Sequence, residues 1–415
     1  MTEMQSRAGA SIPHDVVTLV GTLAAIYLVS QFLRNSIGVI APDLAAEIGL
    51  SAGEIGLLSS AFFFAFAAAQ LPLGIAIDRY GPKRCMLMCA VVAVLGTLLF
   101  AMAITPAGLI IARVLMGLGS SCYLMAPLAL YARRFPPERF TVLAGIQLAI
   151  GTVGTLFVTA PLAWATAAIG WRTTFLVVAG LMSACAVLIA VVIRENDNER
   201  SHPGSGETLR DSLAGVLEVL RMRAFVPLFL MHAMSYSSYV LIVGLWGGPF
   251  LAHVYGYDLT TRGNLLMLPA LSHIIGVVLW GHAERIFGAY KPLVLAGALA
   301  SAGALLLLAA IGRLEPFWLA VWLAVFGFLP AYFPVLLSHG RSLLPAHLIG
   351  RGITLFNIGT IGGTFVVQLI SGMLIDLFPP QGGVYPLDAY RLVFAMQGVG
   401  ILAACAAYAT VRRSP

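Results

Sequence analysis

The chain has 415 residues, of which 60% are hydrophobic and only 10% are charged. Soluble domains carry about 25% charged residues and disordered chains have low hydrophobicity, so the composition excludes both classes. The net charge of +6 comes from scattered basic residues and not from a basic stripe, which argues against nucleic-acid binding.

Twelve apolar runs follow one another along the chain. A membrane-spanning helix needs about 20 mostly apolar residues, and these runs lack the alternation typical of barrel strands. They therefore predict an all-α membrane protein with twelve transmembrane helices. The runs begin near Val16, Gly53, Cys85, Ala107, Thr141, Thr173, Phe225, Gly263, Pro292, Phe317, Gly350 and Arg391.

The basic residues predict the orientation of these spans. If both termini are cytoplasmic, 18 of the 24 lysines and arginines fall on the inner side and four on the outer side. Such an excess on one side is typical of cytoplasmic loops. The four outer residues are Arg172, Arg262, Arg313 and Arg391, and the two that remain within spans are Arg34 and Arg113.

The longest polar stretch divides the chain into two halves. Residues 194–223 begin as a linker and continue as an amphipathic helix that we expect on the inner membrane surface. This predicts an N-terminal six-helix half at 1–193 and a C-terminal six-helix half at 224–415. Matching segments such as 150–154 and 358–362, or Pro127 and Pro334, recur at offsets of 206 to 208 residues, as expected for duplicated halves with a substrate site between them.

The loop between spans two and three resembles the signature loop of the major facilitator superfamily. Its sequence runs Gly74-Ile-Ala-Ile-Asp78-Arg79-Tyr-Gly81-Pro-Lys83-Arg84, and Trp280–Lys291 is similar to a weaker second copy. The segment 113–119 resembles a further family motif, with Met116 where glutamine is usual. The resemblance implies two pseudo-symmetric six-helix halves, with Asp78 facing the start of a helix of the other half as a cytoplasmic latch. It implies a gating role for Gly74, Asp78, Arg79, Gly81, Lys83, Arg84, Glu284 and Arg285.

The two intramembrane arginines predict an anionic substrate. All 18 acidic residues can be placed outside the hydrocarbon core, so neither arginine has a carboxylate at its depth. A buried charge is costly, and a guanidinium binds a carboxylate or phosphate through two parallel hydrogen bonds. Arg113 also fits a structural role within its family motif, and Arg34 could instead extend toward the membrane surface or pair with an outer acid.

Two polar triplets are expected to line the pathway between the halves. Tyr27, Gln31 and Arg34 share one face of span one, and the triplet of span seven has the same spacing at an offset of 205 residues. Ordinary interhelical hydrogen bonds are the alternative. The span-seven residues are His232, Tyr236 and Tyr239.

His232 and His273 are the candidates for a transported proton, because they are the histidines deepest in the spans. Packing inside the protein is the alternative for both. Weaker polar candidates are Gln147, Asn264, Asn357 and Gln368.

These patterns predict a secondary transporter of a small, carboxylate-type organic anion, by proton symport or anion exchange, in a bacterial inner membrane. The predicted partners are the substrate, a proton and the bilayer, the chain is expected to be a monomer, and no nucleic acid, cofactor, metal site or enzyme activity is expected. The alternatives are an exporter of drugs, against which the absence of their usual span-five motif argues, a copper importer, and a nontransporting membrane sensor.

Overall fold

The computed structural model describes residues 14–193 and 209–411, which are almost entirely helical. Twelve segments in these ranges are long and apolar enough to cross a membrane, which confirms the predicted number of spans. The chain is therefore a multi-pass integral membrane protein. The spans are Val16–Asn35, Ala52–Tyr80, Pro82–Met102, Pro106–Arg134, Glu138–Val158, Ala160–Val192, Phe225–Tyr255, Leu259–Phe287, Tyr290–Ile311, Pro316–Ser342, Ile349–Ile375 and Leu387–Ala409.

Several spans contain two helices joined at a break. The first bundle consists of α1 (His14–Asn35), α2 (Ile37–Ile48), α3 (Ala52–Tyr80), α4 (Pro82–Met102), α5 (Pro106–Ser120), α6 (Cys122–Arg134), α7 (Pro137–Gly154), η1 (Thr155–Val158) and α8 (Ala160–Val192). The remaining elements are α10 (Leu209–Arg221), α11 (Phe225–Leu241), η2 (Ile242–Trp246), α12 (Gly247–Tyr255), α13 (Leu259–Phe287), α14 (Tyr290–Ile311), α15 (Pro316–Phe328), η3 (Leu329–Tyr332), α16 (Phe333–Ser342), η4 (Ala346–Leu348), α17 (Ile349–Ile375) and α18 (Leu387–Ala409).

The sixth span is preceded by a short helical segment that the sequence did not predict. We expected the span to begin near Thr173, and α8 starts at Ala160, turns a corner at Gly170, where φ is +78°, and continues as one helix to Val192. Glycine adopts this left-handed region without a steric penalty. The corner was not predicted because residues on both sides of it are apolar, so hydropathy alone does not separate them.

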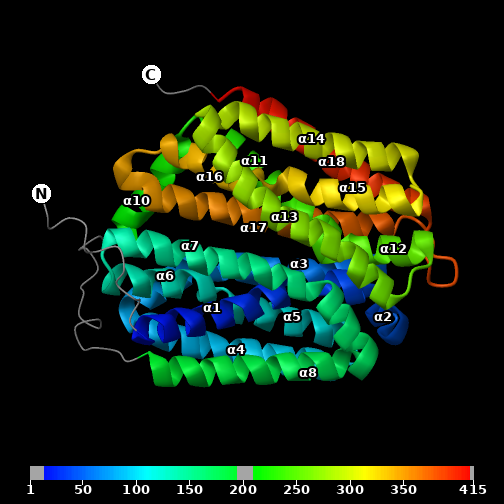
Figure 1. Ribbon diagram of the computed structural model, residues 1–415, viewed down its shortest axis with the longest axis horizontal. Coiled ribbons are helices and arrows are strands. Elements are labelled where there is room, and N and C mark those ends of the chain that lie inside the picture. The colour runs from blue at the N-terminus through cyan, green and yellow to red at the C-terminus, as the bar shows by residue number, and fades with distance from the viewer. Residues whose placement is uncertain (1–13, 194–208, 412–415) are drawn as a thin grey trace, which may run out of the picture.

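The two bundles lie side by side with their helices aligned (Figure 1). Helix α10 lies at the same end as the start of α1 and the end of α18, and we call this the linker end. Helices α2 and α12 lie at the opposite end, which we call the loop end. The positive-inside rule predicts that the linker end is cytoplasmic. Residues 194–208 of the predicted linker lie outside the described residues, so the domain boundaries stay predictions.

Helix breaks recur at equivalent places in the two bundles. Span one breaks at Ser36, and span seven winds into the π-helical turn η2 around Val243, which is 207 residues later. Span four breaks at Ser121, and span ten passes into the 3-10 turn η3 at Leu329, which is 208 residues later. Broken helices are typical of binding sites in secondary transporters, because they free backbone groups near the middle of the membrane.

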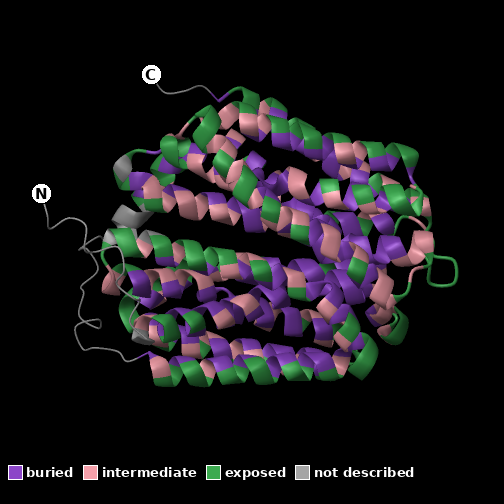
Figure 2. Ribbon diagram, viewed as in Figure 1, coloured by how far each residue is buried: buried purple, intermediate pink, exposed green. Residues whose placement is uncertain are grey.

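Exposed apolar side chains cover the outward faces of the bundles. Met88 on α4 and Val191 on α8 are 68% and 69% exposed. Figure 2 shows this pattern, with buried residues gathered inside the bundles and exposed ones along the outward faces of α4 and α8. An apolar exterior over a packed interior is what lipid tails require of a spanning protein.

The halves meet most closely toward the loop end. A Cβ atom at Gly38 of α2 would overlap the backbone of η2 at Val243, and one at Gly56 of α3 would overlap Gly372 of α17. Small residues allow helix backbones to approach this closely. These glycines therefore allow α2 to pack against η2 and α3 against α17.

Candidate functional site

Arg113 is fully buried on α5 and binds backbone carbonyl groups. Its Nη1 donates to the carbonyl oxygen of Leu33 at 2.6 Å, its Nη2 to that of Arg34 and its Nε to that of Leu58, both at 3.3 Å. The break after α1 leaves the last carbonyl groups of that helix without intrahelical donors. Arg113 supplies hydrogen-bond donors to the carbonyl groups of Leu33 and Arg34, and its bond to Leu58 joins the end of α1 to α3. Each of its three nitrogen atoms is engaged in this way.

Arg34 is in a different situation, although it lies on the helix that Arg113 holds. It is 8% exposed, and its guanidinium carbon lies 4.5 Å from the centre of the Phe66 ring of α3. Its Nε is buried without a hydrogen-bond partner, and among the described residues no carboxylate forms an ion pair with it. Among the described residues, Arg34 is therefore a buried cation that no carboxylate neutralises.

The other two residues of the α1 triplet lie beside Arg34. The Tyr27 ring packs against Gly151 of α7, where a Cβ atom would overlap it. Gln31 is 8% exposed, and its Oε1 has no partner among the described residues. Tyr27 is within electrostatic range of Arg34 and also of Tyr236 from the other half. The predicted face of α1 therefore does turn toward the seam between the halves.

Two residues of the span-seven triplet, Tyr236 and Tyr239, lie near the first half, whereas the third, His232, packs within the second half. Tyr236 is half-buried and approaches Tyr27. Tyr239 stacks on His273 of α13 with 4.0 Å between ring centres and lies close to Thr155 of the first half. Tyr236 and Tyr239 thus each approach a residue of the first half.

His232 packs inside the second half. Its ring stacks on Phe356 at 5.0 Å with 7° between the planes, and its edge meets Phe333. Its Nδ1 lies 3.4 Å from the hydroxyl of Thr360 on α17. The side chain is fully buried and these contacts join α11 to α17, while its Nε2 has no hydrogen-bond partner among the described residues.

His273 has a ring nitrogen available for proton exchange. Its Nδ1 lies 3.0 Å from the carbonyl oxygen of Gly327, which can only accept, so Nδ1 carries the hydrogen. In the neutral ring Nε2 is then the basic atom. Because the ring stacks on Tyr239, a proton at Nε2 would lie next to the aromatic wall of the site.

The weaker polar candidates differ in burial and in hydrogen bonding. Gln147 is engaged, since its Oε1 accepts from Tyr131 and its Nε2 donates to the carbonyl of Leu23. Asn264 is exposed and Asn357 is half-buried. Gln368 on α17 is fully buried, and neither polar atom of its amide has a partner among the described residues.

Sequence reasoning missed Asn35. It is 1% exposed at the last position of α1, and its Oδ1 has no partner among the described residues. The signal was present, because Asn35 follows Gln31 by four residues and so shares its helix face. Ser59 of α3, which is fully buried with an unpartnered hydroxyl, gave no comparable signal in the sequence.

The predicted gating loop lies at the linker end. Asp78 is 72% exposed and pairs with Arg133 of its own half at 3.2 Å. Gly81 joins α3 to α4 with φ of +85°, and Lys83 donates to the carbonyl of Ala190 at 2.8 Å. These contacts all lie within the first half.

The remaining predicted gating residues fall at the same end of the two bundles. In the second copy of the motif, the carbonyl of Glu284 accepts from Gly288, which caps α13. The others are Gly74 and Arg79 near the end of α3, Arg84 in the first turn of α4 and Arg285 in the last turn of α13.

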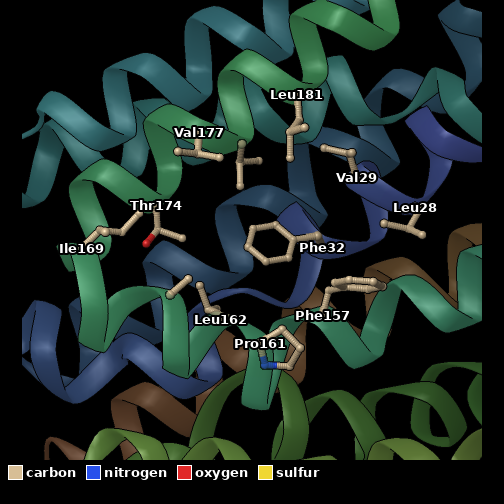
Figure 3. A pocket seen from close by; sticks show the side chains of 12 residues that line it. Leu28, Val29, Phe32, Phe157, Pro161, Leu162, Ile169, Thr174, Val177 and Leu181 are labelled. Atoms are coloured by element: carbon tan, nitrogen blue, oxygen red, sulfur yellow. The ribbon is translucent and has the colours of Figure 1, made fainter.

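An apolar cavity of about 260 Å³ lies elsewhere, in the first half between α1 and α8 (Figure 3). Phe32, Leu162 and Val178 are among its lining residues. Thr174, which also lines it, donates its hydroxyl hydrogen to the carbonyl of Gly170 at 2.8 Å. None of the predicted site residues lines this cavity, so it is distinct from the candidate site.

Comparisons with known proteins agree with this architecture. A probable sulfoacetate transporter of Cupriavidus necator is 24% identical over 406 residues, covering 93% of this chain and 92% of that protein. The hexuronate transporter of Escherichia coli strain K12 is 21% identical over 387 residues, covering 89% of each chain.

A solved structure has the same fold. The inward-facing, unoccupied structure of a bacterial homologue of the human lysosomal transporter Spinster superposes with a TM-score of 0.78 at 20% identity, covering 96% of this chain and 97% of that one. The sequence model of the Major Facilitator Superfamily matches residues 23–260, which is more than half of the chain. The chain therefore belongs to the major facilitator superfamily, as its signature loop and its twelve helices in two bundles predict.

Proposed function

We propose that this protein is a secondary transporter of a small organic anion and that Arg34 binds the charged group of the substrate. The observation that carries the proposal is the burial of the Arg34 side chain at the seam without a carboxylate partner among the described residues. An arginine cannot release its proton to escape such a site. A bound carboxylate or sulfonate would neutralise it and accept two parallel hydrogen bonds.

The relatives support an anionic substrate. Sulfoacetate and hexuronates, which the relatives are named for, are both anions at neutral pH. Among the described residues no group of three or more histidines, cysteines or acids could hold a metal ion, which gives no support to copper as the cargo. The helix breaks beside the site supply the hinges that alternating access requires.

Arg113 has a positioning role in this proposal. Its three hydrogen bonds fix the carbonyl groups of Leu33 and Arg34, and so fix the direction in which the Arg34 side chain leaves α1. Substitution of Arg113 should therefore reduce protein stability, whereas substitution of Arg34 should reduce substrate binding without unfolding the protein.

Binding and uptake measurements test the role of Arg34. Arg34→Gln should weaken binding of hexuronate and sulfoacetate by roughly 100-fold, since truncating one partner of a buried charge pair costs about 2 to 5 kcal/mol. The matched control is Arg313→Gln, because Arg313 stacks on Tyr255 in the second half and lies in the loop after α14, away from the site. Uptake into proteoliposomes that is equal for wild type and Arg34→Gln would refute the proposal.

Coupling to a proton can be tested at the same site. We propose that His273 exchanges the proton if transport is symport, because its ring stacks on Tyr239 at the candidate site and its Nε2 is the basic atom, whereas the ring of His232 stacks on Phe356 inside the second half. His273→Gln should then abolish the pH dependence of uptake, and His232→Gln should change stability more than pH dependence. Anion exchange predicts that uptake requires anion on the opposite side of the membrane and is unaffected by His273→Gln.

A further inference from the structure

Four uncharged polar side chains on α1, α3 and α17 are buried with unsatisfied polar atoms. Gln31 and Asn35 on α1, Ser59 on α3 and Gln368 on α17 are 8%, 1%, 0% and 0% exposed. Each has at least one side-chain polar atom without a hydrogen-bond partner among the described residues, and Gln368 has two. More than nine in ten buried polar groups in proteins are satisfied, so several unsatisfied groups in one region indicate something that binds there.

The hydrogen bonds of Arg113 show that these residues lie at one level of the bundle. The guanidinium bridges the carbonyl groups of Leu33 and Leu58, so the end of α1 and residue 58 of α3 are at the same depth. Gly56, less than one turn away on α3, packs directly against the backbone of Gln368. The break of α1, residue Ser59 and the backbone of Gln368 therefore lie in one layer between the halves.

The π-helical turn of span seven completes this layer. The Oδ1 of Asn35 lies against Gly244 of η2, where a Cβ atom would be 3.1 Å from it. Two residues later Trp246 donates to the hydroxyl of Ser371 at 2.7 Å, and that hydroxyl donates to the carbonyl of Gln368 at 2.8 Å. One turn of η2 thus connects Asn35 with Gln368. Such π-helical turns occur frequently at functional sites.

The chemistry of these groups matches hydroxyl groups better than charged ones. An amide side chain presents donors and an acceptor together, and a hydroxyl is also both donor and acceptor. A ligand hydroxyl can therefore satisfy both atoms of an amide such as Gln368. Leaving a buried amide unpaired costs about 1 to 3 kcal/mol for each group, which favours a ligand able to pair with them.

We propose that Gln31, Asn35 and Gln368 form a neutral subsite for hydroxyl groups, with Ser59 beside it, and that the transported anion is a polyhydroxylated carboxylate of the sugar-acid class. The inference rests on the proposed function, because Arg34 holds the carboxylate from which the hydroxyl-bearing carbons extend. It distinguishes between the relatives, since a hexuronate carries several hydroxyl groups and sulfoacetate carries none.

The decisive variant is Gln368→Met, which keeps the length of the side chain and removes its amide. Ligand binding to the purified full chain is measured with glucuronate, the six-carbon carboxylate hexanoate and sulfoacetate. The wild type should bind glucuronate more than 100-fold more tightly than hexanoate. Gln368→Met should lose roughly 10- to 100-fold in glucuronate affinity, the equivalent of about 1.4 to 2.8 kcal/mol, and should leave hexanoate affinity unchanged.

The thermal stability of the ligand-free protein separates binding from a structural role. Because Gln368 makes no side-chain hydrogen bond to the described residues, Gln368→Met should not lower the melting temperature without ligand. It should remove most of the stabilisation that glucuronate gives. Asn35→Leu provides a second test, with the same expected loss for glucuronate only.

The outcomes separate the two proposals. If Arg34→Gln abolishes anion binding while Gln368→Met and Asn35→Leu bind glucuronate as the wild type does, the hydroxyl subsite is refuted and the anion site stands. A wild type that prefers sulfoacetate or hexanoate to glucuronate also refutes the subsite. Unchanged binding of all three anions by Arg34→Gln refutes the proposed function itself.

Discussion

The two ends of the seam between the halves are held in opposite ways. At the loop end, Asp376 of the second half accepts hydrogen bonds from the backbone nitrogen of Gly53 at 2.7 Å and from the hydroxyl of Ser51 at 3.1 Å, both in the first half. Its other oxygen accepts from Tyr385 at 3.0 Å. Ser51 and Gly53 lie at the start of α3, where the helix dipole favours an anion. Asp43 and Arg262 form a second bridge between the halves at 2.8 Å.

At the linker end, the corresponding polar groups bind within their own half. Asp78 pairs with Arg133 in the first half, and Lys291 donates to the carbonyl of Ala409 in the second. The family resemblance implies that Asp78 latches onto the other half in the opposite state of the transport cycle. The difference teaches that these polar contacts between the halves, among the described residues, lie at the loop end, so we expect opening of that end to require them to break.

The largest expected effect comes from Asp43→Ala. Arg262 is 4% exposed, and the substitution leaves its charge buried without the Asp43 carboxylate. Truncating one member of a buried pair costs about 2 to 5 kcal/mol, so the loop-end-closed state should lose at least about tenfold in population. Distances between spin labels at Ile104→Cys and Phe317→Cys, in a background without the five native cysteines, measure the opening at this end.

A double variant is the control for this prediction. Asp43→Ala with Arg262→Met removes both charges and should restore much of the closed population, because a buried pair can often be replaced by apolar residues without loss. Equal opening in the single and double variants would show that the bridge does not hold the loop end.

A somewhat smaller effect is expected from Asp376→Ala. The substitution removes the acceptor of three hydrogen bonds, and a bond to a charged group contributes about 1.5 to 3 kcal/mol. Because the carboxylate is partly exposed to solvent, we expect a shift of roughly tenfold toward opening at the loop end, measured with the same labels. Asp388→Ala is the matched control, since Asp388 pairs with Arg391 of its own half. A shift of the same size in that variant would contradict the latch.

The next effect concerns packing instead of charge. Gly38→Ala places a methyl group against the backbone of Val243 and Gly244, which cannot move aside as a flexible side chain can. Overpacking costs about 1 to 3 kcal/mol, so the loop end should open and uptake should fall. Gly21→Ala, on the preceding helix α1, meets nothing within 4 Å and should transport normally. Uptake at the wild-type rate by Gly38→Ala would contradict the tight packing of α2 against η2.

These comparisons also show what could be learned from the sequence. The spans and the signature loop were predictable, because hydropathy and a short motif are local properties of the chain. The face carrying Tyr27, Gln31 and Arg34 was predictable from helical spacing. The hydrogen bonds from Arg113 to backbone carbonyls could not be predicted. They depend on a helix break after Asn35, and the apolar residues around it give no sign of that break. The Asp376 contact joins positions more than 300 residues apart, so it required the packing of α3 against α17.

The smallest expected effect is a pH dependence at the loop end that leaves the seam intact. Glu47 of α2 accepts from the ring nitrogen of Trp171 at 2.6 Å and from Arg172 at 2.8 Å, all within the first half. The hydrogen bond from Trp171, followed by those from Arg172, lowers the pKa of Glu47 below its usual value of 4.5. A lowered pKa stabilises the fold above the unfolded-state pKa, and this contribution is lost as the pH falls through the folded-state value.

The melting temperature of the wild type should therefore fall as the pH is lowered below about 4.5, and Glu47→Gln should remove part of that dependence. Because the Glu47 side chain is about half exposed, solvent screens the interaction and the change should be modest. The distance between the labels at the loop end should not change, since Glu47 binds only within its own half among the described residues. Opening of the seam in Glu47→Gln would mean that contacts inside a half, and not only those between halves, control the transport cycle.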